Sequence, residues 1–255
     1  MNTQTPKIAL ITGGSRGLGR NTAESLARKG IDSVITYNSR ADEARKVVTA
    51  IQAEGRQAVA LQLDTGAVQT FIGFVEKLKH TLRETWGQDR FDFLINNAGT
   101  SHHNSFEKTT EEEMDALYKV HFKGVFFLTQ RLLPLINDGG RIINLSSGLT
   151  RIIFPGSGAY GSMKGAIEVL TKYMARELGP RRITVNVVAP GAIATDFSGG
   201  MVRDNPEINK RVAHMTALGR VGLPDDIGPM IASLLSDDNR WVNAQRIEAS
   251  GGMSI

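Results

Sequence analysis

The chain contains no cysteine among its 255 residues. A disulfide framework, a cysteine-ligated zinc site and a thiolate nucleophile are therefore excluded, and the composition fits a reducing compartment. No apolar run approaches the roughly 18 residues that a membrane-spanning helix needs. The N-terminus is polar, and the first apolar run leads into a glycine-rich turn, so we expect no signal peptide. These absences predict a cytoplasmic location and no membrane partner.

A strong excess of one charge is also missing, because 30 Lys and Arg face 26 Asp and Glu. Acidic and basic residues are interspersed, for example along 40–46, so we expect a mixed surface and no nucleic-acid partner. The acidic run 111–113 is better explained as a helix start, because Thr110 and Glu113 form a capping-box pattern. No metal site is expected.

Short apolar runs alternate with helical patterns along the chain, without a repeat or a linker. Strands are expected at 8–12, 33–37, 58–63, 91–95, 141–145, 183–188 and 246–249. Helices are expected at 20–29, 41–54, 71–84, 114–136, 160–178 and 224–235. This alternation predicts an α/β protein over 1–255, a single-domain Rossmann fold whose doubly wound parallel sheet has helices on both faces.

A glycine-rich turn separates the first strand from the first helix, where 12–19 reads TGGSRGLG. The spacing of Gly13, Gly17 and Gly19 differs from the usual G-x-G-x-x-G pattern of dinucleotide sites. Its physical use is the same, because glycine lets the backbone approach a pyrophosphate at the free N–H groups of a helix N-terminus. Ordinary strand–helix turns also favour glycine, but the place after the first strand favours a dinucleotide site.

The end of the second strand indicates which dinucleotide binds. An NAD site usually has an acidic residue there, but Asn38, Ser39 and Arg40 follow the strand and Asp32 lies at its other end. Together with Arg16, these polar residues suit the 2′-phosphate of NADP(H). The alternative is an unremarkable polar loop.

Tyr160 and Lys164 are spaced i,i+4, so they share a face of their predicted helix, and Ser147 ends the fifth strand. With these residues the chain resembles the short-chain dehydrogenase/reductases over essentially its whole length, including 3-oxoacyl-[acyl-carrier-protein] reductase-like and carbonyl reductase members. The matching segments are TGGSRGLG at 12–19, NNAG at 96–99, YGSMK at 160–164, PGAIAT at 190–195, GRVGLPDD at 219–226 and ASGG at 249–252.

The resemblance implies an oxidoreductase that reversibly transfers a hydride between NADPH and a ketone or secondary alcohol. Tyr160 would exchange the proton with the substrate oxygen, and Lys164 would lower the pKa of the tyrosine and bind the nicotinamide ribose. Ser147, rather than its neighbour Ser146, would hydrogen-bond the substrate. The alternative is a nucleotide-sensing binding protein on the same fold with little turnover.

The same resemblance implies a set of cofactor contacts, although Asn96 and Asn97 could instead brace the strand ends. The implied cofactor-binding residues are Gly13, Ser15, Arg16, Gly17, Leu18, Gly19, Tyr37, Asn38, Ser39, Arg40, Asp64, Thr65, Asn97, Ala98, Gly99, Tyr160, Lys164, Pro190, Gly191, Ile193 and Thr195.

His121 departs from the family pattern, which commonly has asparagine in N-x-x-G-x-F where this chain has HFKGVF at 121–126. The asparagine is thought to hold a water that links the lysine to solvent. His121 could keep that water and join the catalytic set, or it could be only a structural substitute. His102 and His103 lie in a loop near the expected mouth of the site, where they could line the substrate pocket.

The resemblance leaves the substrate open among 3-oxoacyl thioesters, small ketones, sugars and steroids. A lid loop is expected at about 196–219, with apolar residues such as Phe197 and Met201. An acidic acyl carrier protein would need basic residues beside the cleft, and Arg181 and Arg182 are candidates.

A homotetramer is expected from the family, which pairs two long helices across a two-fold axis. Here these are the predicted helices 114–136 and 160–178. Both carry apolar residues on more than one face, namely Val125, Phe127, Leu128, Ile167, Leu170 and Met174.

Overall fold

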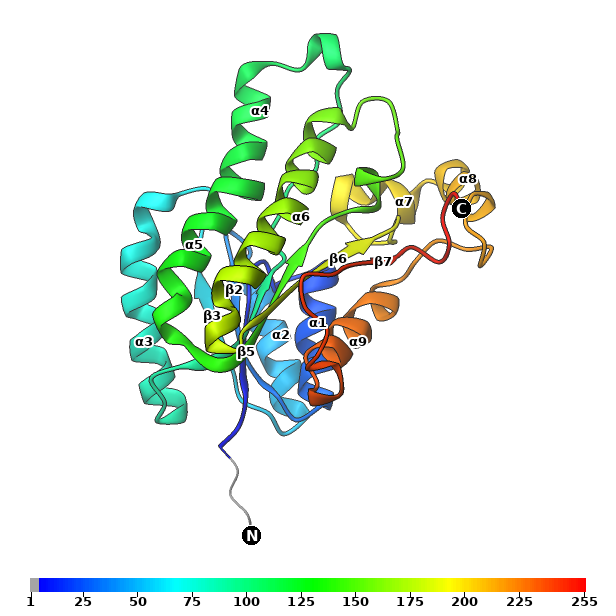
Figure 1. Cartoon of the computed structure of the whole chain (residues 1–255). Helices are drawn as coiled ribbons and strands as arrows, with labels where there is room; N and C mark the ends of the chain where they lie inside the picture. The colour runs from blue at the N-terminus through cyan, green and yellow to red at the C-terminus, as the bar shows by residue number, and fades with distance from the viewer. Residues whose placement is uncertain (1–4) are drawn as a thin grey trace.

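Seven strands form one parallel sheet in the order β3-β2-β1-β4-β5-β6-β7 (Figure 1). The computed structural model describes residues 5–255, so part of the N-terminal segment considered above lies outside the described residues. The strands are β1 (Ile8–Ile11), β2 (Asp32–Tyr37), β3 (Ala58–Gln62), β4 (Phe91–Asn96), β5 (Ile136–Leu145), β6 (Thr184–Pro190) and β7 (Arg246–Ala249). The predicted doubly wound sheet is confirmed. Its strand order reverses between β1 and β4, where such sheets open a crevice at their carboxyl ends.

Both faces of the sheet are covered, so its strands are apolar on both sides. In β1, Ile8 and Leu10 belong to one buried cluster, and Ala9 and Ile11 belong to the other. Figure 1 shows that helices cover both faces of the sheet. The first cluster packs under α3 (Phe71–Trp86), α5 (Gly124–Leu132) and α6 (Gly158–Leu178), and the second under α1 (Gly17–Arg28), α2 (Ala41–Ala53) and α9 (Pro224–Leu234).

The predicted helix 114–136 is divided and ends early. It begins as α4 (Glu111–Tyr118), where the predicted capping box of Thr110 and Glu113 is present. One π-helical turn, Lys119–Lys123, then leads into α5. A short 3-10 turn, Leu133–Leu135, follows α5, and β5 starts at the next residue.

The predicted start of the fifth strand at Arg141 is therefore wrong. Phe91 pairs with Ile136 and Phe93 with Arg141, so the residues between them form a bulge inside β5. Gly139 has φ +78°, which favours glycine. A Cβ on Gly140 would lie 2.7 Å from the Asp92 carbonyl oxygen. In the sequence, the pair Gly139-Gly140 is compatible with a loop and with a bulge. The pairing of β5 with β4 shows that it is a bulge.

The expected lid segment 196–219 is largely helical. It contains α7 (Met201–Asp204) and α8 (Pro206–His214), and the Asn205 side chain caps α8 by accepting from the Glu207 and Ile208 N–H groups. These helices form a lobe beside the C-terminus (Figure 1). The lobe encloses a small apolar cluster of Ile152, Val212, Val221 and Met253.

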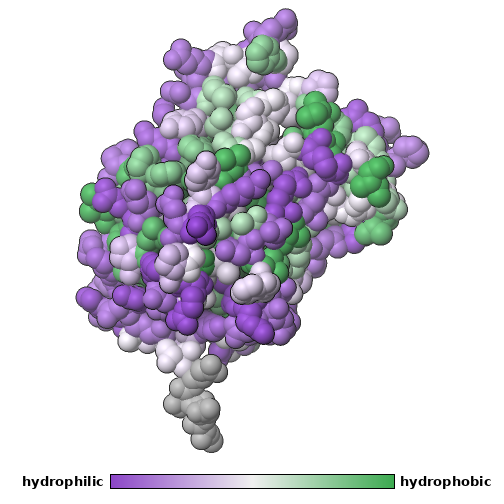
Figure 2. All heavy atoms as spheres, viewed as in Figure 1, coloured by the Kyte–Doolittle hydropathy of each residue, from purple (hydrophilic) through white to green (hydrophobic). Residues whose placement is uncertain are grey.

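The surface is mostly hydrophilic on the face seen in Figure 2, where hydrophobic residues appear in separated groups. Over residues 5–255 there is no helix with the length and apolarity needed to cross a membrane.

Candidate active site

A cleft of about 370 Å³ opens at the carboxyl ends of β1, β2, β4, β5 and β6. Its size is that of a small-molecule site, and its place is the crevice where the strand order reverses. Segments far apart in the sequence meet there because parallel strands all end at the same edge of the sheet.

All predicted catalytic and cofactor-binding residues except Gly19 line this cleft. Gly19 lies behind the turn, where a Cβ would come within 2.3 Å of the Gly13 carbonyl oxygen. It therefore allows α1 to pack closely against the turn rather than contacting a ligand. The cleft also contains residues that the motifs did not indicate, namely Leu63, Thr100, Val120, Leu145, Ser146, Asp196 and Phe197. Asp196 and Phe197 continue the motif PGAIAT, and Thr100 continues NNAG, so these three could have been found by extending the motifs.

The glycine-rich turn has the shape that a dinucleotide phosphate requires. Gly13 and Gly17 have positive φ values of 66° and 53°, and a Cβ on Gly13 would lie 2.9 Å from the Ala98 Cα atom. Arg16, the N-cap of α1, makes no side-chain cap. The first turn of α1 therefore offers its N–H groups and the positive end of its dipole to an anion. These features fit a bound dinucleotide.

The far corner of the cleft is polar and basic. Asn38, Ser39 and Arg40 line it, together with Arg16 from the turn. Asp32 lies at the other end of β2, buried, where it accepts hydrogen bonds from Gln57 N at 3.0 Å and Trp86 Nε1 at 2.8 Å. No carboxylate at the end of β2 thus competes for this corner.

Arg16 has an acidic partner that the sequence did not suggest. Its Nη1 lies 2.5 Å from Asp196 Oδ2, across the mouth of the cleft. Asp196 precedes the lobe, so this ion pair joins the glycine-rich turn to the segment that leads into α7. A phosphate in the basic corner would compete with Asp196 for the same guanidinium.

Tyr160 and Lys164 project from α6 towards the end of β5, where Ser147 follows the strand. Lys164 Nζ donates to the Leu145 carbonyl oxygen at 2.8 Å and lies 5.6 Å from the centroid of the Tyr160 ring. Ser146 Oγ instead donates to Glu168 Oε1 at 2.7 Å. Ser147 is therefore the serine whose hydroxyl contacts Tyr160.

Burial controls the protonation of this group. It raises the pKa of Tyr160, and a hydrogen bond from Ser147 opposes that shift. Burial also lowers the pKa of Lys164 to about 8. At neutral pH the tyrosine keeps its proton and the lysine is mostly charged. The cleft thus presents a proton donor beside a cation.

His121 lies on the π-helical turn, buried against the same group. Its Nε2 is 2.8 Å from the Thr100 carbonyl oxygen, and its ring meets the Tyr160 ring edge-on with centroids 5.2 Å apart. Burial and the Lys164 charge lower its pKa to about 3, so the ring is neutral. Its Nδ1 is buried and has no hydrogen-bond partner among residues 5–255. This nitrogen can hold one water.

Two suggestions from the sequence are wrong. His102 and His103 do not line the cleft: His102 Nε2 lies 3.7 Å from Glu113 Oε2, and the His103 ring packs on Gly156. Arg181 lies before the amino end of β6, opposite the cleft, where it pairs with Asp138 at 2.8 Å. Arg182 is its neighbour, so neither arginine stands beside the cleft.

Comparison with known proteins identifies the family. A family model described as enoyl-(acyl carrier protein) reductase matches residues 13–254. The chain belongs to the short-chain dehydrogenase/reductase family. An uncharacterized oxidoreductase of Methylorubrum extorquens is 38% identical over 247 residues, which cover 97% of each chain.

Two solved structures of this family resemble the chain closely. The promiscuous reductase LugOII, which catalyses keto-reduction at C1 during lugdunomycin biosynthesis, superposes with a TM-score of 0.93 at 40% identity, covering 98% of this chain and 99% of its own. The landomycin C-6 ketoreductase LanV, solved with NADP and rabelomycin, gives a TM-score of 0.89 at 38% identity, covering 98% and 97%. The family predicted from the motifs is confirmed.

Proposed function

We propose that this protein is an NADP(H)-dependent reductase that interconverts a ketone and a secondary alcohol. The observation that carries the proposal is the convergence of Ser147, Tyr160 and Lys164 in a cleft with a phosphate-binding turn and a basic corner. Similar proteins support the proposal. LanV is a ketoreductase solved with NADP. Versicolorin reductase 1 from Dothistroma septosporum is 34% identical to this chain over 256 residues. A cytoplasmic location is part of the same proposal.

The residues of the cleft divide the chemistry among them. When bound, NADPH supplies the hydride for the carbonyl carbon. Tyr160, which keeps its proton at neutral pH, donates that proton to the carbonyl oxygen. Ser147 hydrogen-bonds the same oxygen and orients it. The Lys164 ammonium stabilises the phenolate that Tyr160 leaves behind, and it also lies where the nicotinamide ribose would bind.

The substrate is a ketone on or beside a fused ring system. Phe197 supports this, because its ring lies 6.2 Å from the Tyr160 ring, tilted by 54°, and its side chain is partly exposed to the cleft. A flat aromatic substrate would lie along Phe197 with its carbonyl oxygen at Tyr160. The segment 196–219 would cover it as the lid. Among the similar proteins, LugOII catalyses keto-reduction at C1 during lugdunomycin biosynthesis, and LanV is solved with rabelomycin.

Tyr160→Phe tests the reaction. Because the change removes only the proton donor, turnover should fall by about 10²-fold or more, while NADPH binding stays unchanged. The measurement is NADPH absorbance with a panel containing a fused-ring ketone such as α-tetralone and a 3-oxoacyl thioester, with NADPH affinity from fluorescence titration. Wild-type protein that binds NADPH without reducing any ketone would favour the nucleotide-sensing alternative.

The preference for NADP(H) over NAD(H) follows from the basic corner. Arg16→Ala should raise KM for NADPH by about 10-fold or more, because a charge-assisted contact to the 2′-phosphate is lost, and should change KM for NADH little. Asp196→Asn is the matched control, since it frees Arg16 from its ion pair and should lower KM for NADPH. Equal use of both cofactors by the wild type would contradict the assignment.

We further propose that His121 supports proton transfer through a water at its Nδ1. The low pKa of about 3 keeps the ring neutral at working pH, with one donor and one acceptor. In the tautomer this role needs, Nε2 donates to the Thr100 carbonyl oxygen and Nδ1 is the acceptor left for the water; Thr100 N also lies 3.2 Å from Nε2. The alternative is that the ring only supports the Tyr160 side chain.

Substitution of His121 separates these roles. His121→Asn should keep much of the turnover, whereas His121→Ala should lose considerably more, because nothing then holds the water. Turnover is compared with the melting temperature of each variant, and a His121→Ala variant that works at the wild-type rate when folded would rule out the relay. The neutral ring is checked by measuring the free energy of unfolding as a function of pH. In the unfolded chain histidine takes up a proton near pH 6.5, whereas the buried His121 stays neutral. The free energy of unfolding of the wild type should therefore fall by about 2 kcal/mol between pH 6.5 and 5, and this fall should be absent in His121→Asn.

A homotetramer is proposed from the outer faces of the long helices. Two of the six residues named for this role from the sequence, Leu128 and Ile167, are buried in the subunit itself. Other apolar side chains are exposed on the same helices. On the α4–α5 segment Tyr118 and Phe126 are each 39% exposed, and on α6 Val169 and Tyr173 are 54% and 65% exposed. A second copy that covered these side chains would remove them from water.

Light scattering at micromolar concentration should therefore give the mass of a tetramer. Tyr173→Glu should reduce that mass, because it places a charge in the contact. Ile72→Glu on α3, which is also an exposed apolar position, is the matched control and should leave the mass unchanged. A monomeric wild type would refute the assembly.

A further inference from the structure

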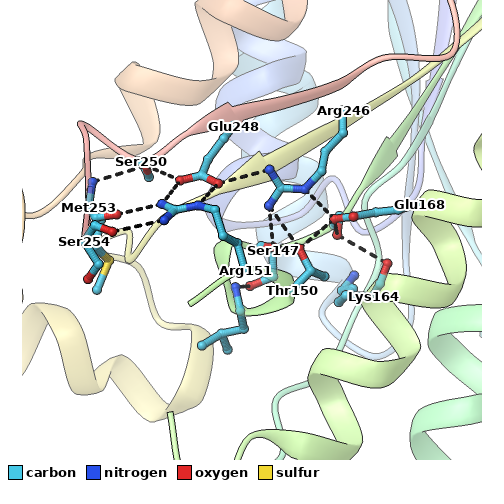
Figure 3. A network of polar contacts seen from close by, with 12 residues as sticks. Ser147, Thr150, Arg151, Lys164, Glu168, Arg246, Glu248, Ser250, Met253 and Ser254 are labelled. Atoms are coloured by element: carbon cyan, nitrogen blue, oxygen red, sulfur yellow. Dashed lines mark hydrogen bonds and ion pairs between the residues drawn. The ribbon is translucent and has the colours of Figure 1, made fainter. Parts of the chain in front are cut away.

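One carboxylate connects the two parts of the active site. Glu168 lies on α6 one turn beyond Lys164, and its Oε1 accepts hydrogen bonds from Ser146 Oγ at 2.7 Å and Thr150 Oγ1 at 2.8 Å. Ser146 directly precedes Ser147, and Thr150 follows it by three residues on the segment after β5. Figure 3 shows Thr150 and Ser147 beside Glu168. The helix that carries Tyr160 and the segment that carries Ser147 are therefore joined through Glu168.

Arg246 of β7 completes this junction. Its Nε donates to Glu168 Oε1 at 2.8 Å, and its Nη2 lies 3.0 Å from Thr150 Oγ1 and 3.5 Å from the Ser147 carbonyl oxygen. The side chains of Glu168 and Arg246 are only 18% and 25% exposed. A carboxylate this far removed from water needs a charged partner, and Arg246 provides it.

Arg246 also has an acidic partner on the side away from Glu168. Glu248 accepts from Arg246 Nη1 at 3.0 Å and from Arg151 Nε at 2.9 Å. Arg151 in turn donates to the Met253 carbonyl oxygen at 2.7 Å (Figure 3). Acidic and basic side chains thus alternate from α6 across β7 to the C-terminal segment. Arg246 has partners on both sides, which restricts its position.

We propose that Glu168 and Arg246 are positioning residues that hold the Ser147 hydroxyl against Tyr160. The inference rests on the proposed function. Tyr160, Lys164 and Glu168 follow one another at intervals of four residues on α6, so they share one side of the helix. Because Glu168 binds on both sides of Ser147, it sets the distance between the serine and the tyrosine. Displacements of about 1 Å in such a group are enough to reduce a rate by about 10²-fold.

The pH dependence of the reaction should depend on the distance between the Ser147 and Tyr160 hydroxyl groups. The titratable side chains that face Tyr160 are Lys164 on α6 and His121 on the π-helical turn. Removal of the Glu168 carboxylate leaves both in place. The hydrogen bond from Ser147 lowers the pKa of Tyr160, so displacement of Ser147 should raise that pKa. Alcohol oxidation, which needs the phenolate, should then reach half of its maximal rate at a higher pH.

The test compares Glu168→Ala with Glu168→Gln. The alanine variant should lower kcat by about 10-fold or more and shift the oxidation profile to higher pH, with KM for NADPH unchanged. The glutamine variant keeps an acceptor oxygen in the same place, so it should retain most of the activity and the wild-type profile. Arg151→Gln is the control, because this arginine contacts Glu248 but neither residue beside Ser147, and it should keep kcat and the profile.

Three results would overturn the inference. One is a Glu168→Ala variant with wild-type kcat. Another is a loss of kcat that follows the melting temperature while the pH profile stays in place, which would make Glu168 purely structural. The third is absence of ketone turnover in the wild type, which would show that the proposed function itself has failed. If Glu168→Ala does not fold, Arg246→Gln is measured with the same readouts and should give the same shift.

Discussion

The active site depends on the burial of one charged group, the ammonium of Lys164. Removing a lone ammonium from water is costly, so it needs a partner inside the protein. The Leu145 carbonyl oxygen, at the end of β5, is that partner at 2.8 Å. This contact requires α6 to lie directly against the end of β5. It thereby brings Tyr160 to the segment that carries Ser147. After burial of the ring itself, the nearby Lys164 charge is the second cause that lowers the pKa of His121.

Buried polar contacts keep the strand ends in register around this contact. Asn96 Nδ2 donates to Asn144 Oδ1 at 2.8 Å, which joins β4 to β5, and Asn144 Nδ2 donates to Thr171 Oγ1 at 2.9 Å, which joins β5 to α6. Asn97 Nδ2 donates to the Thr12 carbonyl oxygen at 2.8 Å and so holds the glycine-rich turn. Satisfied polar networks in a core specify one arrangement. The bracing role considered for these asparagines is therefore present, and Asn97 also lines the cleft.

The cleft has two ends with different chemistry. At the basic corner, Arg16 is shared between Asp196 and any phosphate that binds, so ligand binding and the position of the covering segment are linked. At the inner end, the group around Tyr160 is rigid, because Glu168 and Arg246 join α6, β7 and the segment after β5.

The sequence by itself determined the family, the order of strands and helices along the chain, and most of the cleft residues. Its apolar runs and glycine motifs are local patterns, and local patterns carry that information. The predicted start of β5 was wrong, because a glycine pair in a sequence is typical of a loop. Only the pairing with β4 shows that these glycines form a bulge inside the strand. Contacts between distant segments were decided only by the tertiary structure. Arg16 with Asp196, Glu168 with Arg246, and the burial that moves the pKa values of Tyr160, Lys164 and His121 all arise from residues that meet only after the strands have aligned. No spacing along the chain encodes such meetings, because ion pairing and desolvation depend on distance in space.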